Sequence, residues 1–133
     1  MAADSEGFVE KIGHHVARFE PPDLFHLKFV GDLSAEELLN VSQVLKRATG
    51  KFYIAMETTE MGSFTSGAKK VIREVPLAAG IAIFGASRQM QLVLSILNKV
   101  YMMVNLGKDI KLTFVSTEEE ARRWIEYLRQ GKG

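Results

Sequence analysis

Residues 80–87 read Gly-Ile-Ala-Ile-Phe-Gly-Ala-Ser, a short apolar run that ends in a turn signal. Five residues without a polar side chain predict a β-strand that is covered on both faces, as in a parallel sheet. The turn Gly85–Ser87 leads into a long apolar helix, expected over residues 88–105. Two other short runs, Phe52–Met56 and Lys111–Val115, predict two more strands of the same sheet.

The sequence before these strands predicts a β-hairpin. Polar and apolar residues alternate over His15–Glu20 and again over Leu24–Val30. Between the two segments, Pro21-Pro22-Asp23 excludes a helix and favours a turn. Residues 1–13 are polar and contain two glycines, so they predict a flexible tail. We therefore expect a single domain over residues 14–131.

Helices are expected between the strands. Ser34 and Glu37 form a capping box at the start of the first helix. A polar loop is expected over Glu57–Phe64, followed by a second helix from Thr65 to Val75 that Pro76 ends. The last helix begins after Thr117 with three glutamates. The order ββαβαβαβα predicts an α/β fold: a mainly parallel sheet with an antiparallel hairpin at its edge and helices packed against it.

Length, charge and composition narrow the class of protein. The chain has 133 residues, which is typical of one domain. Its 17 basic and 16 acidic residues are well mixed, and such a balance gives no reason to expect a nucleic acid as partner. The N-terminal residues do not resemble a signal peptide, and no run of 18 apolar residues predicts a transmembrane segment. The expected location is the cytoplasm.

The sequence lacks the common motifs of catalytic sites. The sequence contains no cysteine, no glycine-rich nucleotide-binding motif and no nucleophile elbow. Its three histidines, His14, His15 and His26, all fall in the hairpin, and adjacent strand residues point to opposite faces. We expect histidines at the surface or at the sheet edge rather than a metal site. The sequence thus argues against an enzyme and predicts neither cofactor nor metal.

Two segments are candidates for function. The first is Gly62–Gly67, Gly-Ser-Phe-Thr-Ser-Gly, whose three hydroxyls either cap the second helix or carry a regulatory phosphate. The second is the long helix, whose apolar residues cover about two-thirds of its circumference, whereas one contact with a sheet needs roughly a third. Deep burial, self-association and an apolar ligand cavity are the alternatives for this helix.

Several strings at the junctions between elements resemble the STAS domain of anti-sigma-factor antagonists. They are Leu27–Leu38, Thr65–Val71, Ile81–Ser87 and Phe114–Ile125, and the resemblance covers about residues 13–130. It is closer to the divergent SpoIIAA-like branch, which shares its fold with CRAL-TRIO lipid-binding domains. The last string is the most specific, because that branch typically ends in an acidic helix cap followed by Ala-Arg-x-Trp.

The resemblance implies a non-catalytic regulatory module that binds a protein partner, such as an anti-sigma factor or a kinase-like regulator. In that family a serine before the second helix is phosphorylated; alignment on Gly67 places Thr65 there, and Phe64 where the family has aspartate. The phosphosite candidates are Thr65, Ser66 and Ser63. The expected partner surface comprises Gly31, Asp32, Phe64, Gly67, Lys69, Lys70, Ser87 and Arg88.

The rival hypothesis is a carrier of an apolar, lipid-like ligand, as in the lipid-binding relatives. For that function, or for a homodimer, the long helix offers a cavity wall or a dimer surface. Its candidate residues are Met90, Leu94, Leu97, Tyr101, Met102 and Met103.

Overall fold

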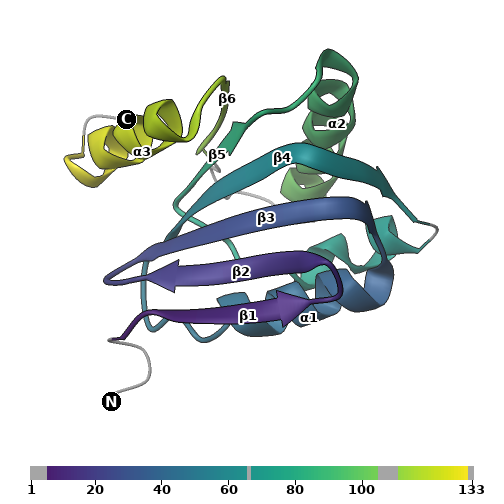
Figure 1. The fold of residues 1–133 in the computed structure, drawn as a ribbon, viewed down its shortest axis with the longest axis horizontal. Coiled ribbons are helices and arrows are strands. Elements are labelled where there is room, and N and C mark those ends of the chain that lie inside the picture. Colours follow the sequence, from purple (N-terminus) through teal and green to yellow (C-terminus); the bar gives the residue numbers. More distant parts are fainter. Residues whose placement is uncertain (1–5, 66, 105–110, 132–133) are drawn as a thin grey trace.

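The computed structural model describes residues 6–65, 67–104 and 111–131, and these form one six-stranded sheet with four helical segments (Figure 1). In chain order the elements are β1 (Phe8–Ile12), β2 (His15–Glu20), β3 (Leu24–Leu33), α1 (Ala35–Leu45), β4 (Tyr53–Phe64), the 3-10 helix η2 (Ala68–Glu74), β5 (Gly80–Phe84), α2 (Arg88–Val104), β6 (Lys111–Val115) and α3 (Glu118–Arg129). The strands lie side by side in chain order. β1, β2 and β3 are antiparallel, and β3 to β6 are parallel.

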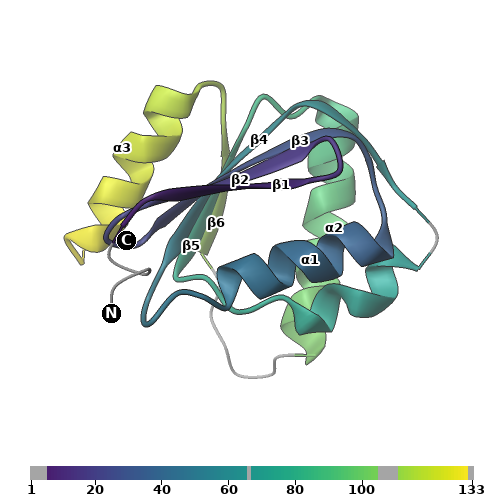
Figure 2. The same ribbon diagram turned by 60° about the horizontal axis from the view of Figure 1, so that its bottom comes forward.

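The helices form two layers, one on each face of the sheet. Each crossover between parallel strands advances the chain in the same direction, and right-handed crossovers then place the connecting segments on one face. Accordingly α1, η2 and α2 lie on one face and α3 lies on the other (Figure 2). On the α3 face, Ala55, Ala82 and Ala121 are fully buried. These small side chains let α3 pack closely against the sheet.

The core predictions for the sheet are confirmed. β5 and β6 have the predicted bounds, Gly80–Phe84 and Lys111–Val115, and both are parallel to β4 in the same sheet. The hairpin of β2 and β3 lies on the other side of β4. The capping box is also present: the Ser34 hydroxyl accepts from the Glu37 amide at 3.1 Å, and Glu37 accepts from the Ser34 amide at 3.0 Å. Among the described residues, no helix is long and apolar enough to cross a membrane.

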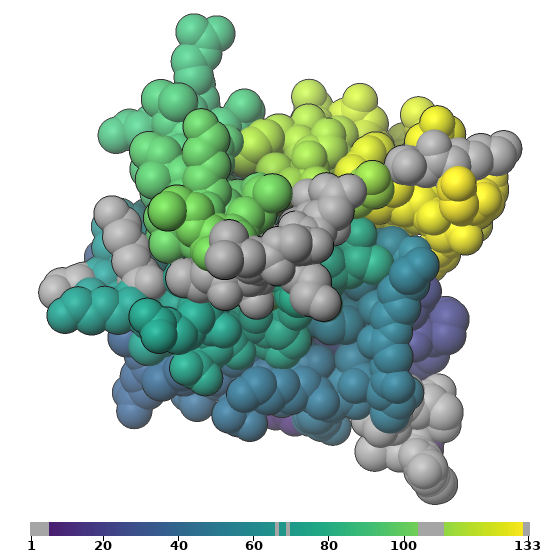
Figure 3. Space-filling view, turned by 180° about the vertical axis from the view of Figure 1, so that it is seen from behind, coloured from purple at the N-terminus to yellow at the C-terminus, as the bar shows by residue number. Residues whose placement is uncertain are grey.

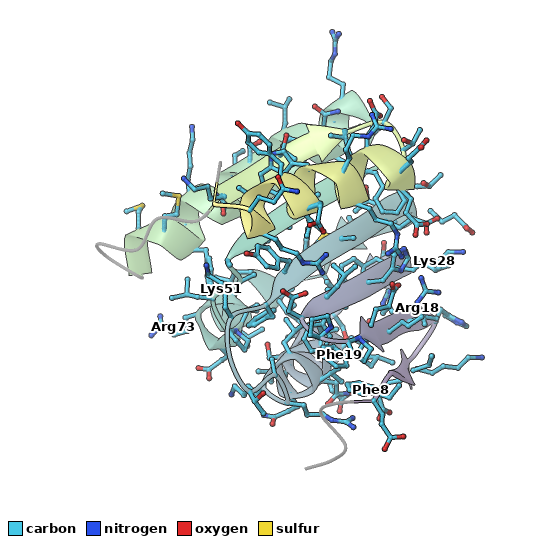
Figure 4. The ribbon with its side chains drawn as sticks, turned by 90° about the vertical axis from the view of Figure 1, so that its left-hand side faces the viewer. Phe8, Arg18, Phe19, Lys28, Lys51 and Arg73 are labelled. Carbon is cyan, nitrogen blue, oxygen red and sulfur yellow. The ribbon has the colours of Figure 1, made fainter. Side chains whose placement is uncertain are left out.

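The predicted tail is wrong for residues 8–12, which form β1 and pair with β2. Phe8 stacks on Phe19 with 5.4 Å between the ring centroids, and Figure 4 shows the two side chains on neighbouring strands. The Arg47 guanidinium lies 3.8 Å from the centroid of the Phe8 ring, in a cation–π contact. Because Phe19 and Arg47 are remote in sequence from Phe8, the local composition does not reveal what orders this strand.

The polar stretch Glu57–Phe64 is not the loop that its composition predicts, because β4 continues through it. β4 has 12 residues. Its partner β3 has 10 residues and supplies backbone partners as far as the pair Leu33–Phe64. Two register shifts in this pairing, between Lys28 and Val30 and between Gly31 and Leu33, each take up one additional residue of β4.

The second helix differs from its prediction in both type and starting point. It is the 3-10 helix η2 and begins at Ala68 rather than Thr65. Gly67 has a φ of +93°, a left-handed conformation that a continuous helix cannot contain. Thr65 precedes this turn, and its backbone amide donates to the Leu33 carbonyl at 3.0 Å. Thr65 therefore ends the pairing of β4 with β3 and does not start a helix.

Two of the three histidines are buried, contrary to the expected surface positions. His14 is exposed, whereas His15 and His26 are 1% and 7% exposed. His15 reaches the interior because it lies on the face of β2 that packs toward α1. His26 lies on the opposite face of the sheet, where the N-terminal turn of α3 covers it. Alternation in a hairpin fixes which side each residue takes, but not whether that side is covered.

Candidate functional site

An apolar cavity of about 110 Å³ lies between the sheet and the layer of α1, η2 and α2. Strands β3 to β6 and the helices on this side contribute to its wall. The lining residues include Leu27 and Phe29 from β3, Ile54 and Met56 from β4, Ile81 and Ile83 from β5, Leu38 and Leu45 from α1, and Leu94 and Leu97 from α2. The space therefore lies among the core side chains between the sheet and its helices.

The cavity is explained by the segment that connects β4 to β5. Figure 3 shows α1, η2 and α2 next to one another on this face, coloured blue, teal and green. η2 is a 3-10 helix of seven residues, narrower than the α-helices on either side, and it contacts both α1 and α2. Ile72, at η2, and Val75, directly after it, line the cavity from this side. A slim connector between two full α-helices leaves the space beneath it unfilled.

The cavity wall is almost entirely apolar. Among the described residues that line it, Asn98 and Tyr101 are the ones whose side chains carry nitrogen or oxygen. The Tyr101 hydroxyl donates to the Val75 carbonyl at 2.5 Å, and burial raises the pKa of Tyr101 to about 12. The phenol thus stays protonated and holds α2 to the end of η2. An ordered water needs two or more polar partners, so a space with such a wall favours an apolar occupant.

Six residues of α2 were predicted to form a cavity wall or a dimer surface. In the structure they fall into two groups. Leu94, Leu97 and Tyr101 line the cavity, and Met90 packs against the same cluster. Met102 and Met103 are exposed and lie outside the wall. Sequence reasoning did not identify the part of the wall that the sheet provides, because no local pattern shows that strand residues face an empty volume.

The remaining apolar residues of α2 explain its broad apolar arc. Leu92, Ile96, Val100 and Met103 recur at helical spacing and are all exposed, from 37% to 70%. We call these four residues the outer stripe. The helix thus carries an inner apolar face toward the cavity and an outer one toward solvent, so deep burial alone does not account for its composition.

The candidate residues at the carboxyl ends of β3 and β4 lie together. The Asp32 carboxylate accepts from the backbone amide of Ser63 at 2.8 Å and from its hydroxyl at 3.3 Å. A side chain at Gly62 would collide with that carboxylate, so glycine is needed there. Ser63 is exposed and Thr65 is half-buried. Phe64, between them, lines the cavity instead of forming the expected partner surface.

The residues of the predicted partner surface come from the ends of different strands and from the segments that follow them. β5 pairs with β4 as far as Phe84 and Glu57, after which β4 continues to Phe64 for roughly 23 Å at about 3.3 Å per residue. Ser87 and Arg88 follow β5, whereas Ser63 is in β4, six residues beyond the last residue of β4 that pairs with β5. The Ser87 hydroxyl accepts from the Met90 amide at 3.1 Å and so caps α2. Ser87 and Arg88 are both exposed.

The other candidate residues of that surface lie in β3, at the turn before η2 and on η2. Gly31 pairs with Met61, next to Asp32, and Gly67 precedes η2. Lys70 is exposed on η2. Ser66 and the side chain of Lys69 lie outside the part of the chain that the structure describes.

Comparison of the chain with family models, with curated proteins and with solved structures finds no match.

Proposed function

We propose that this protein is a non-catalytic binding protein that takes a compact apolar ligand into the cavity beneath η2. The observation that carries the proposal is the cavity itself, about 110 Å³ with an almost wholly apolar wall. For comparison, an engineered apolar cavity of about 150 Å³ in another protein stays dry and binds benzene or xenon. A ligand of similar size, or the end of a longer apolar chain, suits this space.

The proposal agrees with the carrier hypothesis drawn from the resemblance to lipid-binding relatives, but it specifies a smaller ligand. A whole lipid has a polar head and long chains, which need several times this volume. The wall offers Met56 and Met61, whose flexible thioether side chains adapt to occupants of different shape. The cavity therefore suits small apolar molecules of several shapes rather than one molecule of fixed shape.

Filling the cavity is expected to abolish binding. Leu94→Phe places a larger ring in the wall, so toluene should bind at least about tenfold more weakly than to the unaltered protein. Leu92→Phe is the matched control: it makes the same substitution two residues away on α2, where Leu92 is 64% exposed, and should leave the affinity unchanged. Titration with toluene, followed by amide chemical shifts in two-dimensional NMR spectra, measures both.

The outcomes of this titration are decisive. Saturable shifts around Ile83 and Leu97 that Leu94→Phe removes would support the proposed function. If the unaltered protein shows no saturable shifts with toluene, or if Leu92→Phe weakens binding as much as Leu94→Phe does, the cavity does not bind apolar ligands.

We propose as a second candidate a regulatory module that binds a protein partner at the carboxyl ends of β3 and β4, similar to anti-sigma-factor antagonists. The pair of Asp32 and Ser63 favours it, because this pair joins both strand ends and leaves Ser63 exposed. A phosphate on Ser63 would face the Asp32 carboxylate, and repulsion between like charges would break the pair.

For this second candidate we expect phosphate on Ser63 rather than Thr65, because the Ser63 side chain is exposed and Thr65 is half-buried. Incubation with cell extract and ATP, followed by peptide mapping, locates the phosphate. Ser63→Ala should remove it and Thr65→Ala should retain it. Absence of phosphate from residues 63–66 in the unaltered protein would contradict the switch.

A further inference from the structure

The polar groups of the cavity wall lie on one face of α2. Asn98 and Tyr101 are three residues apart in this helix, so their side chains are neighbours on its surface. Among the described residues that line the cavity, none is charged. Among the side chains of this wall, these two are therefore the candidates for polar recognition of a ligand.

Tyr101 already uses its hydroxyl proton within the protein. It is 6% exposed, and its hydroxyl donates to the Val75 carbonyl at 2.5 Å. This bond connects α2 to the residue after η2 and closes the layer above the cavity. Tyr101 thus serves to hold the wall together.

Asn98 has capacity left for a ligand. It is half-buried, and within the described residues its amide nitrogen contacts the Met102 sulfur at 3.6 Å. Thioether sulfur is a weak acceptor, so this contact costs little to replace. The side-chain carbonyl of Asn98 makes no hydrogen bond to a described residue. An amide in either orientation offers one strong acceptor and two donors.

We propose that the ligand of this cavity is a compact neutral amphiphile, with an apolar body in the cavity and one hydroxyl or amide group bound by Asn98. This inference rests on the proposed function and names the class of ligand and the residue that selects it. A charged head group is disfavoured, because transferring an ion to an apolar wall without an opposite charge is costly. A ligand without a polar group leaves Asn98 to solvent or to Met102.

The test compares three probes of similar size: toluene, benzyl alcohol and benzoate. An unpaired hydroxyl carried into an apolar site weakens binding, whereas a bond to Asn98 offsets this cost. We therefore expect the unaltered protein to bind benzyl alcohol at least as tightly as toluene, and benzoate without saturation.

Substitution of Asn98 identifies its role. Asn98→Leu keeps a similar volume but removes both hydrogen-bonding groups, so benzyl alcohol should bind about tenfold more weakly while toluene stays within about twofold. The toluene measurement also reports that the cavity is intact in the variant. Ser95→Ala, also a polar residue of α2 but outside the cavity wall, is the control and should change neither affinity.

Each outcome has a distinct meaning. If toluene binds but benzyl alcohol binds more than tenfold more weakly, or if Asn98→Leu affects both probes equally, the inference is wrong and the proposed function stands. Tight binding of benzoate would also overturn the inference. If none of the three probes binds with saturation, the proposed function itself fails.

Discussion

Replacement of His15 by alanine is expected to lower the free energy of unfolding by about 3 kcal/mol. The His15 ring is 1% exposed and packs edge-on against Phe29, with 5.5 Å between the ring centroids. Its Nδ1 accepts from the Val30 amide at 3.0 Å, and its Nε2 lies 3.1 Å from Glu37 Oε1. Because Nδ1 is an acceptor, Nε2 carries the proton and donates it to Glu37.

The loss has three parts. The alanine variant leaves the Val30 amide without its acceptor in the interior, and it leaves a void where the ring was. It also frees Glu37, which caps α1 through the Ser34 amide. One ring therefore connects β2, β3 and the start of α1, and its removal weakens all three.

Urea unfolding, followed by the fluorescence of Trp124, the one tryptophan of the chain, measures this loss. His14→Ala is the matched control, because the neighbouring His14 is exposed and its removal should change stability by less than about 0.5 kcal/mol. A loss below about 1 kcal/mol for His15→Ala would show that these bonds contribute little in solution.

Substitution of the other buried histidine is expected to have the opposite effect on stability. His26→Phe should raise the free energy of unfolding by about 2 kcal/mol at pH 7.5. His26 is 7% exposed, and its Nε2 is fully buried without a hydrogen bond. The nearest carboxylate oxygen, Glu118 Oε1, is 3.7 Å away, beyond hydrogen-bonding distance. A phenyl ring keeps the contact with Phe84, at 5.9 Å between ring centroids, and removes the unsatisfied nitrogen.

The same residue makes stability depend on pH. Burial is the largest influence and lowers the pKa of His26 below 6.5; Arg18 and Arg122 also lower it, while Glu118 and Glu57 raise it. Below about pH 6.5 the unfolded chain takes up a proton that the folded protein resists. Stability should therefore fall as the pH drops from 7.5 to 5.5, and less so in His26→Phe.

Urea unfolding at pH 7.5 and 5.5 tests both statements, with His14→Gln as the control that keeps His26. If His26→Phe loses less stability on acidification than the unaltered protein, His26 causes part of the pH dependence. An equal loss in both proteins, or a His26→Phe variant that is less stable at pH 7.5, would contradict the assignment.

The elements that the sequence predicted correctly are those whose cause is local. β5 was predicted to the residue because a strand covered on both faces has an uninterrupted apolar run, and the bounds of β6 also match their prediction. The capping box of Ser34 and Glu37 is likewise readable from two residues three positions apart. The broad apolar arc of α2 left deep burial, self-association and a cavity wall as alternatives, and in the structure Leu94, Leu97 and Tyr101 line the cavity.

The elements that the sequence did not reveal depend on distant partners. β1 is ordered by Phe19 and Arg47, and the polar end of β4 by the length of β3. The cavity itself depends on how much volume η2 leaves between two α-helices, and no residue pattern encodes that volume. His26 follows the same rule, because its burial depends on where α3 packs.

The two faces of the sheet respond differently to compression. A folded chain that encloses empty space has a larger volume than the same chain with water in contact with every atom, so hydrostatic pressure favours states in which that space is hydrated. In this protein the void lies on the side of α1, η2 and α2, whereas Ala55, Ala82 and Ala121 leave little free volume beneath α3. Under pressure, water should therefore enter first on the cavity side. The packing of α3 against the sheet should persist to higher pressure.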